Sequence, residues 1–309
     1  MQSARWMAGL AVVAWLVTGQ AGAGPHDAGR HHAPPPAGVE LKEAEVIVPM
    51  DSFGGRPVVS LTLDGKGPFR FVLDSGAGGS VVSRTLTDSL GLAAEGEVRV
   101  GSPGGATNPG ALVKIGRVEM GGAALVGVTM VATDLSRVFT LPEHPVGVLS
   151  AMSFSGHLVT FDYPAKQIVI KPGALPAANG TDIFAYQAAQ HIPTLSIDVA
   201  GMKVDAHVDS GSGRGLMLPG SLAAKLPLGG PLEELAKAKT VDGEWPIRRA
   251  PLDGQVRIGR FTLDKPQVDF MEGAPIGNIG YEILKDYRLT VDRKNLRFRL
   301  EPGTTISRG

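Results

Sequence analysis

Asp74-Ser75-Gly76 and Asp209-Ser210-Gly211 are the same tripeptide, placed once in each half of the 309-residue chain. Each copy follows an apolar run, residues 69–73 in the first half and residues 204–208 in the second. A strand that ends in Asp-Ser-Gly, repeated in each half, supplies two carboxylates that a pseudo-twofold fold would bring together. Two carboxylates that share one proton and one water can drive hydrolysis without a metal or a cysteine.

The two tripeptides belong to a longer repeat, which indicates an internal duplication. In each half a Pro-led alternating strand precedes the tripeptide, and an Ile-Gly-Arg segment, an apolar segment with a glycine and a closing strand follow it. These landmarks are residues 57–63, 115–118, 146–149 and 159–163 in the first half, and residues 193–199, 258–261, 278–281 and 289–293 in the second. Because they recur in one order at nearly one spacing, we expect two similar lobes that share one cleft.

Short alternating runs and frequent turn residues predict a mainly β protein. The chain has 42 glycines and 23 prolines, which favours short strands and many turns. Short helical patterns occur at residues 83–90, 221–226 and 232–239. The predicted units are an N-terminal lobe at 46–173, an inter-lobe linker at 174–191, a C-terminal lobe at 192–302 and a tail at 303–309.

A glycine-rich stretch at residues 98–110 predicts a β-hairpin that would cover the cleft. Ser102, Gly104 and Gly105 fall at its tip. A phosphate-binding loop is the competing interpretation, but no helix start or lysine follows at the spacing that such a loop requires. In the second half, an Asp-Gly turn signal at residues 242–243 occupies a roughly similar place.

The first 23 residues have the pattern of a secretory signal peptide. Arg5 gives a modest positive start, residues 7–17 are apolar, and Ala21-Gly22-Ala23 fits the small-x-small cleavage pattern, so cleavage is expected after Ala23. An uncleaved anchor helix is the alternative, but the apolar stretch is shorter than the ~20 residues that span a bilayer. We therefore expect a periplasmic or secreted protein that is not held in a membrane after cleavage.

Composition narrows the function further. Lys plus Arg equals Asp plus Glu at 30 each, which removes the electrostatic case for nucleic-acid binding. The absence of cysteine excludes disulfides and thiolate catalysis. Residues 24–45 are Pro/Gly-rich and are predicted to be a disordered linker, in which His31 and His32 are solvated. No metal-binding motif is present, and no cofactor is expected.

These motifs resemble the aspartic peptidases of the pepsin and retropepsin type, in the form of the bacterial retropepsin-like branch with two fused lobes. The resemblance rests on Leu73-Asp74-Ser75-Gly76-Ala77 with Ser80-Val81-Val82, and on Val208-Asp209-Ser210-Gly211-Ser212. It covers roughly residues 55 to 300. It implies two acid-protease-type β-barrel lobes related by a pseudo-twofold axis, with the active site in the cleft between them.

The resemblance also implies roles for individual residues. Asp74 and Asp209 would be the catalytic dyad, and the protein would be an aspartic-type endopeptidase that acts on peptide or protein substrates as a monomer. Ser75 and Ser210 would brace the two loops, and Gly76 and Gly211 would permit their close approach. Gly147 and Gly280 would let the neighbouring strands pass close behind the loops, and Ser102, Gly104 and Gly105 would belong to the flap over the substrate.

Two features depart from the family pattern. The second motif continues Gly213-Arg214-Gly215, so the hydroxyl expected six residues after the aspartate is missing, whereas Ser80 provides it in the first half. Arg214 would also place a positive charge close to the dyad, unless it points to solvent. These departures favour the main alternative, a peptidase-fold module that binds peptides or protein segments in the periplasm without cleaving them.

Other chemistries find less support in the sequence. A Ser/His/Asp hydrolase would need a positioned histidine, but His144 and His157 lie near no nucleophile-elbow pattern, and His207 lies in a strand beside Asp209. Each histidine is better explained as a surface or core residue. The simplest alternative is that both Asp-Ser-Gly motifs are ordinary tight turns in a duplicated β-module without chemistry.

Overall fold

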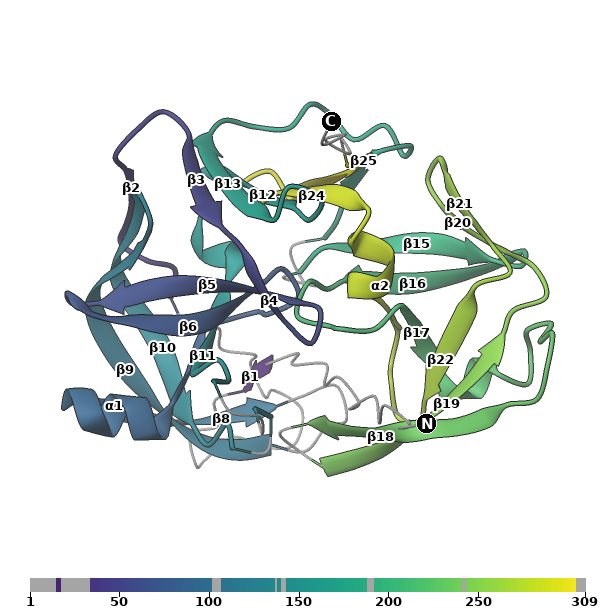
Figure 1. Ribbon diagram of the computed structural model, residues 1–309, viewed down its shortest axis with the longest axis horizontal. Helices are drawn as coiled ribbons and strands as arrows, with labels where there is room; N and C mark the ends of the chain where they lie inside the picture. Colours follow the sequence, from purple (N-terminus) through teal and green to yellow (C-terminus); the bar gives the residue numbers. More distant parts are fainter. Residues whose placement is uncertain are drawn as a thin grey trace, which may run out of the picture.

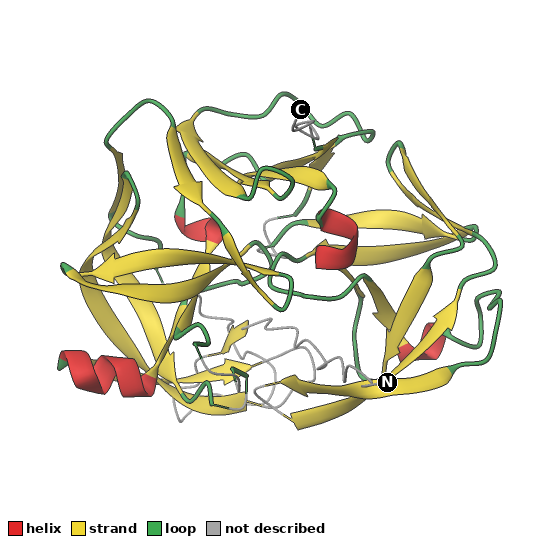
Figure 2. Cartoon of the chain, viewed as in Figure 1, coloured by secondary structure: helices red, strands yellow, loops and turns green. Residues whose placement is uncertain are grey.

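The computed structural model describes residues 15–17, 34–101, 107–136, 138–139, 143–187, 192–240 and 243–303. Strands dominate this part of the chain and helices are short (Figure 2). The strands form two lobes, each built on a curled sheet, and a third sheet that contains strands from both halves of the chain lies above them in Figure 1. This is the two-lobed, mainly β architecture that the sequence predicted.

The sheet of the N-terminal lobe has a short strand at each edge. In sheet order its strands are β1 (Trp15–Val17), β8 (Ala94–Gly101), β9 (Thr107–Met120), β10 (Ala123–Thr133), β7 (Val81–Ser83), β11 (Gly147–Ser150), β6 (Lys66–Asp74), β5 (Arg56–Leu63) and β4 (Asp51–Phe53), with β2 (Gly38–Leu41) paired to β10. Helix α1 (Arg84–Leu90) follows β7, and the 3-10 turn η1 (Ala151–Ser153) follows β11.

The sheet of the C-terminal lobe repeats most of this order with different strands. They are β18 (Glu233–Thr240), β19 (Gly243–Pro251), β22 (Gln267–Met271), β17 (Leu216–Pro219), β23 (Gly277–Ile279), β16 (Met202–Val208), β15 (Thr194–Val199), β20 (Gln255–Ile258) and β21 (Phe261–Asp264). The 3-10 turn η3 (Gly220–Leu222) follows β17, and helix α2 (Tyr281–Leu284) follows β23. The order from β18 to β15 matches that from β8 to β5, which reflects the internal duplication, whereas β20 and β21 take the place of β4 at the edge.

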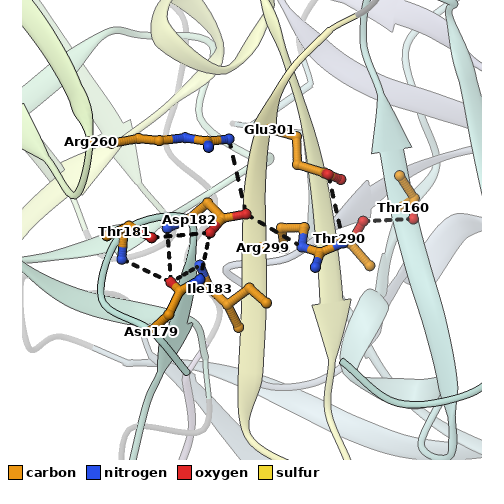
Figure 3. Close-up of polar contacts among 9 residues, drawn as sticks. All are labelled: Thr160, Asn179, Thr181, Asp182, Ile183, Arg260, Thr290, Arg299 and Glu301. Carbon is orange, nitrogen blue, oxygen red and sulfur yellow. Dashed lines mark hydrogen bonds and ion pairs between the residues drawn. The ribbon is translucent and has the colours of Figure 1, made fainter. Parts of the chain in front are cut away.

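The third sheet joins the two halves of the chain. Its strands, in order, are β14 (Ile183–Ala185), β25 (Arg297–Pro302), β24 (Tyr287–Asp292), β12 (His157–Asp162), β13 (Gln167–Pro172) and β3 (Val46–Pro49). At its centre, Thr160 of β12 pairs with Thr290 of β24, and their hydroxyl oxygens are 2.9 Å apart (Figure 3). These threonines occupy the same place in the two copies of the repeat, so the pseudo-twofold axis passes between them.

Strands also occur in both segments that the sequence analysis assigned to linkers. β2, within residues 24–45, pairs with β10, and β14, within residues 174–191, pairs with β25. Before β14, the Asn179 side-chain oxygen accepts hydrogen bonds from the N–H groups of Thr181, Asp182 and Ile183 (Figure 3). This asparagine turn orders the crossing segment before it joins the sheet.

The helix predictions had mixed outcomes. The helix predicted at 83–90 forms α1, but the segment predicted as helix at 221–226 has only the end of η3, and the segment predicted at 232–239 lies in β18 from Glu233 onward. That last segment, Leu-Glu-Glu-Leu-Ala-Lys-Ala-Lys, has a high helix propensity, yet β18 forms there because it pairs along its length with β19. Tertiary pairing therefore overrides the local preference. No helix in the described ranges is long and apolar enough to cross a membrane.

Candidate active site

The two Asp-Ser-Gly loops meet between the lobes. Asp74 is the last residue of β6, and Asp209 directly follows β16. Each of these strands pairs in parallel with the apolar strand behind it, β6 with β11 and β16 with β23. Both aspartates are fully buried. The duplicated strands therefore deliver the two carboxyl groups to one enclosed place.

The serines of the two loops exchange hydrogen bonds across the lobe boundary. The Ser75 N–H donates to the Ser210 hydroxyl at 2.9 Å, and the Ser210 N–H donates to the Ser75 hydroxyl at 3.0 Å. Each hydroxyl in turn donates to the opposite strand, Ser75 to the Val208 carbonyl at 2.9 Å and Ser210 to the Leu73 carbonyl at 3.1 Å. Four buried bonds thus fix one loop against the other.

The glycines of the tripeptides permit close approach of the carboxyl groups. A Cβ atom on Gly76 would lie 2.6 Å from Asp209 Oδ1, and one on Gly211 would lie 2.2 Å from Asp74 Oδ2. Those two carboxyl oxygens are buried and accept no hydrogen bond from any described residue. Each aspartate thus keeps one oxygen available for a shared proton or a water.

The environment raises the proton affinity of both carboxyls, but unequally. Burial, followed by the like charge of Asp209, raises the pKa of Asp74 well above its ordinary value. Burial also raises the pKa of Asp209, but hydrogen bonds and the positive charge of Arg56 oppose this shift. The pair therefore retains a proton above the usual carboxyl range, and Asp74 is its preferred holder.

Asn278 is one source of this inequality. Its side-chain N–H donates to Asp209 Oδ2 at 2.6 Å, which favours the ionised form of Asp209. In β23, Asn278 pairs with His207, two residues before Asp209, and Val148 of β11 pairs with Val72, two residues before Asp74. The first lobe therefore has an apolar residue where the second lobe has the amide.

Arg56 is the second source of the unequal proton affinities of Asp74 and Asp209. Its side chain is 3% exposed, and its Nε–H donates to the Gly211 carbonyl at 2.8 Å. Burial lowers the pKa of Arg56 to about 10, while the charges of Asp209 and Asp74 oppose this shift, so the guanidinium remains cationic at neutral pH. Arg56 precedes the Pro-led strand of the first lobe, and Ile192 precedes that of the second, so this charge also lies on one side only.

A comparison with protein families agrees with this geometry. The aspartyl protease family model matches residues 59–152 and 195–283, which together make up more than half of the chain. The chain belongs to the aspartyl protease family. Each matched region contains one Asp-Ser-Gly loop, so the match recurs once per lobe. No curated protein matches the chain.

In this member of the aspartyl protease family, Arg214 is bound to another carboxylate, although its place in the sequence had suggested a position near the dyad. Its side chain is 7% exposed, and its Nη1 is 2.9 Å from Asp269 Oδ2, so it points neither to solvent nor at the dyad. Arg249 contacts the same carboxylate, through Nε at 2.6 Å and Nη2 at 3.1 Å. The buried Asp269 draws Arg214 away, and Arg56 is the arginine whose charge acts on the dyad.

The strand register corrects the pairing of Gly147 with Gly280. Gly147 pairs with Phe71, three residues before Asp74, and Gly277 pairs with Ala206, three residues before Asp209. The counterpart of Gly147 is therefore Gly277. A Cβ atom on Gly147 would lie 2.2 Å from the Phe71 ring, and one on Gly280 would lie 2.6 Å from the Arg214 carbonyl. Both glycines are still required by close packing behind the loops.

The same register explains the missing hydroxyl of the second motif. In the first lobe, the Ser150 N–H donates to the Ser80 hydroxyl at 3.0 Å. In the second lobe, the Gly280 N–H donates to the Gly215 backbone carbonyl at 3.0 Å. A backbone acceptor thus replaces the serine hydroxyl, and the departure at Gly215 leaves no N–H without a partner there.

Two hairpins extend on the side opposite the six-stranded sheet, β8–β9 from the first lobe and β18–β19 from the second (Figure 1). The predicted flap residues Ser102, Gly104 and Gly105 lie outside the described residues. The strands β8 and β9 on either side of this tip are described, and Val98 and Val100 of β8 pack with Val81 and Ala77 beside the first Asp-Ser-Gly loop.

Two further titratable residues, Tyr163 and His207, are buried. Tyr163 is 6% exposed, and burial, together with the charges of Asp209 and Asp74, raises its pKa, so its hydroxyl stays protonated. Burial lowers the pKa of His207 to about 4, and its Nδ1 lies 2.8 Å from the Thr194 hydroxyl. His207 is a neutral core histidine at pH 7. The described residues contain no cluster of three His, Cys, Asp or Glu that could hold a metal ion.

Proposed function

We propose that this protein is an aspartic endopeptidase that hydrolyses peptide bonds with Asp74, Asp209 and a water. The observation that carries the proposal is the serine exchange, which holds the two aspartates so that Asp74 Oδ2 and Asp209 Oδ1 both lack a donor among the described residues. Two buried carboxyls in this arrangement share one proton, because ionising both would place two like charges together in an apolar site.

The asymmetry of the site supports an assignment of roles within the dyad. Asp209 would be the ionised member, since Asn278 and Arg56 both favour its charge. It would accept a proton from the water, whose oxygen attacks the scissile carbonyl carbon, while Asp74 donates its proton to the carbonyl oxygen. Asp209 then gives this proton to the amide nitrogen while Asp74 recovers a proton from a hydroxyl of the tetrahedral intermediate, so that the C–N bond breaks, the carbonyl re-forms and the dyad returns to its starting state. The dyad titrates as a unit, so these roles describe its preferred protonation state.

A peptide-library digestion of the mature protein from pH 3 to 8, with and without a pepstatin-type inhibitor, tests the proposal. Asp74→Asn and Asp209→Asn should each abolish nearly all turnover while the fold is retained, and the double variant should be little worse, because the residues act jointly. Inhibitor-sensitive cleavage that depends on both aspartates supports the endopeptidase. Peptide binding without turnover in the parent would instead identify the binding module.

We also propose that the chain is exported and that residues 1–23 are removed after Ala23. The support is the apolar stretch at residues 7–17 and the Ala21-Gly22-Ala23 pattern. Sequencing the N-terminus of the protein recovered from the periplasm or the medium tests this. A mature chain that starts at Gly24 agrees with the proposal, and a chain that retains residue 1 contradicts it.

A further inference from the structure

Three polar residues lie at neighbouring positions on one face of the second-lobe sheet. Thr194 of β15 pairs with His207 of β16, and His207 pairs with Asn278 of β23. Residues at paired positions of adjacent strands point to the same face of a sheet, as do residues two apart along one strand. Thr194, His207 and Asn278 therefore form one row, here called the polar row, and Asp209 follows His207 on the same face.

The first lobe has three valines where the second has the polar row. Val58 pairs with Val72, and Val72 pairs with Val148, in the register that relates Thr194, His207 and Asn278. All three valines belong to one buried apolar cluster. The duplicated sheet therefore accepts an apolar row at this place, and the polar row is not a requirement of the fold.

The polar row also carries a cost to stability. Thr194, His207 and Asn278 are 4%, 7% and 4% exposed. Buried polar groups lower stability unless hydrogen bonds compensate for the lost water, a cost that valines do not have. Burial also lowers the pKa of His207 to about 4, which makes the fold less stable in acid. A costly row that the fold does not need points to a role in the site beside it.

Hydrogen bonds hold the polar row at both ends. The Thr194 hydroxyl donates to the Ile192 carbonyl at 3.1 Å, and its oxygen lies 2.8 Å from His207 Nδ1. Because the single hydroxyl hydrogen is used by the carbonyl, the network assigns the proton of the second contact to Nδ1. At the other end of the row, the Asn278 N–H donates to Asp209 Oδ2 at 2.6 Å. His207 thus lies between an anchored hydroxyl and the amide that contacts the dyad.

We propose that His207, anchored by Thr194, is a positioning residue that keeps the Asn278 amide directed at Asp209. The far end of that amide needs such support, because Asn278 Oδ1 is buried and accepts no hydrogen bond from a described residue. A fixed neighbour in the row restricts the rotation of the amide, as second-layer residues do for the groups they support. The consequence for turnover rests on the proposed peptidase function, whereas the effect on the proton affinity of Asp209 does not.

An NMR titration of the aspartate carboxyl carbons in the mature protein tests the proposal without a substrate. His207→Val installs the first-lobe residue and should raise the lower of the two apparent pKa values of the dyad, in the direction expected for Asn278→Val but by less. Where turnover is measured, kcat should fall about threefold to tenfold with KM unchanged, as for one weakened hydrogen bond. Thr194→Val releases the imidazole and should act in the same direction.

Two further variants separate positioning from charge and from packing. His207 itself titrates, so His207→Val also removes a positive charge in acid. His207→Gln is uncharged but can still pair with the Thr194 hydroxyl, and it should keep the dyad close to the parent. Asp74, Arg56 and Tyr163, the other titratable groups that act on or respond to the dyad, are unchanged in every variant. Ile197→Val, on the opposite face of β15, is the packing control and should leave the dyad pKa values in place.

The double variant shows whether His207 acts through Asn278. Adding His207→Val to Asn278→Val should leave the dyad pKa values where Asn278→Val alone puts them. An unchanged dyad in His207→Val, equal shifts with and without Asn278, or a His207→Gln variant that matches His207→Val would each overturn the proposal. A parent that shows the expected shifts and cleaves no peptide would retain the positioning role and contradict only the peptidase function.

Discussion

The Ser75 and Ser210 hydroxyls each accept a hydrogen bond from the backbone N–H of the other, at 3.0 and 2.9 Å, and each donates to the strand that leads into the opposite loop. Neither loop can move without breaking bonds to its counterpart. The position of Asp74 is thus set by the second lobe, and the position of Asp209 by the first. The dyad is pre-organised across a boundary between two halves of the chain.

Removing one hydroxyl should therefore harm both stability and turnover. Ser75→Ala leaves the buried Ser210 N–H without an acceptor, which should destabilise the fold by about 1–3 kcal/mol and lower turnover. Ser75→Thr keeps the hydroxyl and should stay close to the parent. Urea unfolding and peptide hydrolysis measure the two effects. Ser89→Ala, which removes a bond from the Ser89 hydroxyl to Leu86 within α1, is the control. Equal stability of Ser75→Ala and Ser89→Ala would contradict the bracing role.

Replacing Asn278 by valine, the residue at the matching position of the first lobe, should raise the pKa of Asp209. Asn278→Val removes the N–H that donates to Asp209 Oδ2, so the ionised form of Asp209 is disfavoured. The acid limb of the pH–rate profile should move to higher pH. Turnover at the optimum should fall roughly tenfold to a hundredfold, as expected for a hydrogen bond to a charged group. An unchanged acid limb would show that Asn278 does not set the protonation of Asp209.

Substitutions of Arg56 and Arg214 should have different effects, the first on the pH dependence of activity and the second on stability. Arg56→Gln removes the cation that favours the ionised dyad, so the alkaline limb should move to higher pH, and Arg56→Lys should move it less. Arg214→Gln should leave the limb in place and destabilise the fold by up to about 3 kcal/mol, since Asp269 loses one of its two arginines. Paired pH–rate profiles and unfolding curves measure both effects. A limb shift in Arg214→Gln alone would reverse the assignment.

The sequence predicted the parts of the site that are duplicated and missed those that are not. The repeated tripeptides placed Asp74, Asp209 and their serines together, because a duplicated strand-and-loop unit implies a twofold arrangement. Arg56 and Asn278 each occur in one half only, so the repeat gave no signal for them. One possible clue was Arg56 against Ile192, each directly before the first proline of its repeat, and another was the polar Asn278 against the apolar Val148. The second comparison needs the strand register, which the sequence spacing misaligned by pairing Gly147 with Gly280.

Local sequence was also a poor guide where partners far along the chain decide the structure. Residues 232–239 have helical propensity, but β19 provides an antiparallel partner, and a strand forms. Arg214 was expected near the dyad because it lies five residues after Asp209, yet Asp269 on β22 holds it. Secondary structure at an edge hairpin and the direction of a long side chain both depend on contacts that no local pattern contains.

The glycines behind the loops should tolerate a methyl group according to the space around them. Gly147→Ala would place Cβ 2.2 Å from the Phe71 ring and 2.6 Å from the Val81 carbonyl, and we expect a loss of about 3 kcal/mol or more. Gly277→Ala would meet Ala206 Cβ at 3.0 Å and should cost less. Gly96→Ala has no atom within 4 Å and serves as the control. Chemical denaturation measures the series, and an order other than 147, 277, 96 would contradict it.

His207 should limit the stability of the protein in acid. Burial lowers its pKa in the fold to about 4 from an ordinary value of 6.5, so between these values the unfolded chain binds a proton that the folded chain does not. The contribution is fully present above pH 6.5 and is lost as the pH falls towards 4. Over this range it amounts to about 3 kcal/mol. The free energy of unfolding, measured by urea at half-unit intervals from pH 7 to 4, should therefore fall steadily.

His207→Gln should flatten this dependence between pH 6.5 and 4, because Gln does not titrate and can still pair with the Thr194 hydroxyl. The buried carboxyls act in the other direction, since the raised pKa of Asp74 makes its folded, protonated form more favourable as the pH falls. The parent and the variant share that term, so their difference isolates His207. If the two curves run parallel, His207 is not the group that makes the fold sensitive to acid. If the two curves diverge only below pH 6.5, the protonation of His207 lowers the free energy of unfolding in the pH range that favours a protonated dyad. The same acidity that supports the dyad would then destabilise the fold through the strand that leads to Asp209.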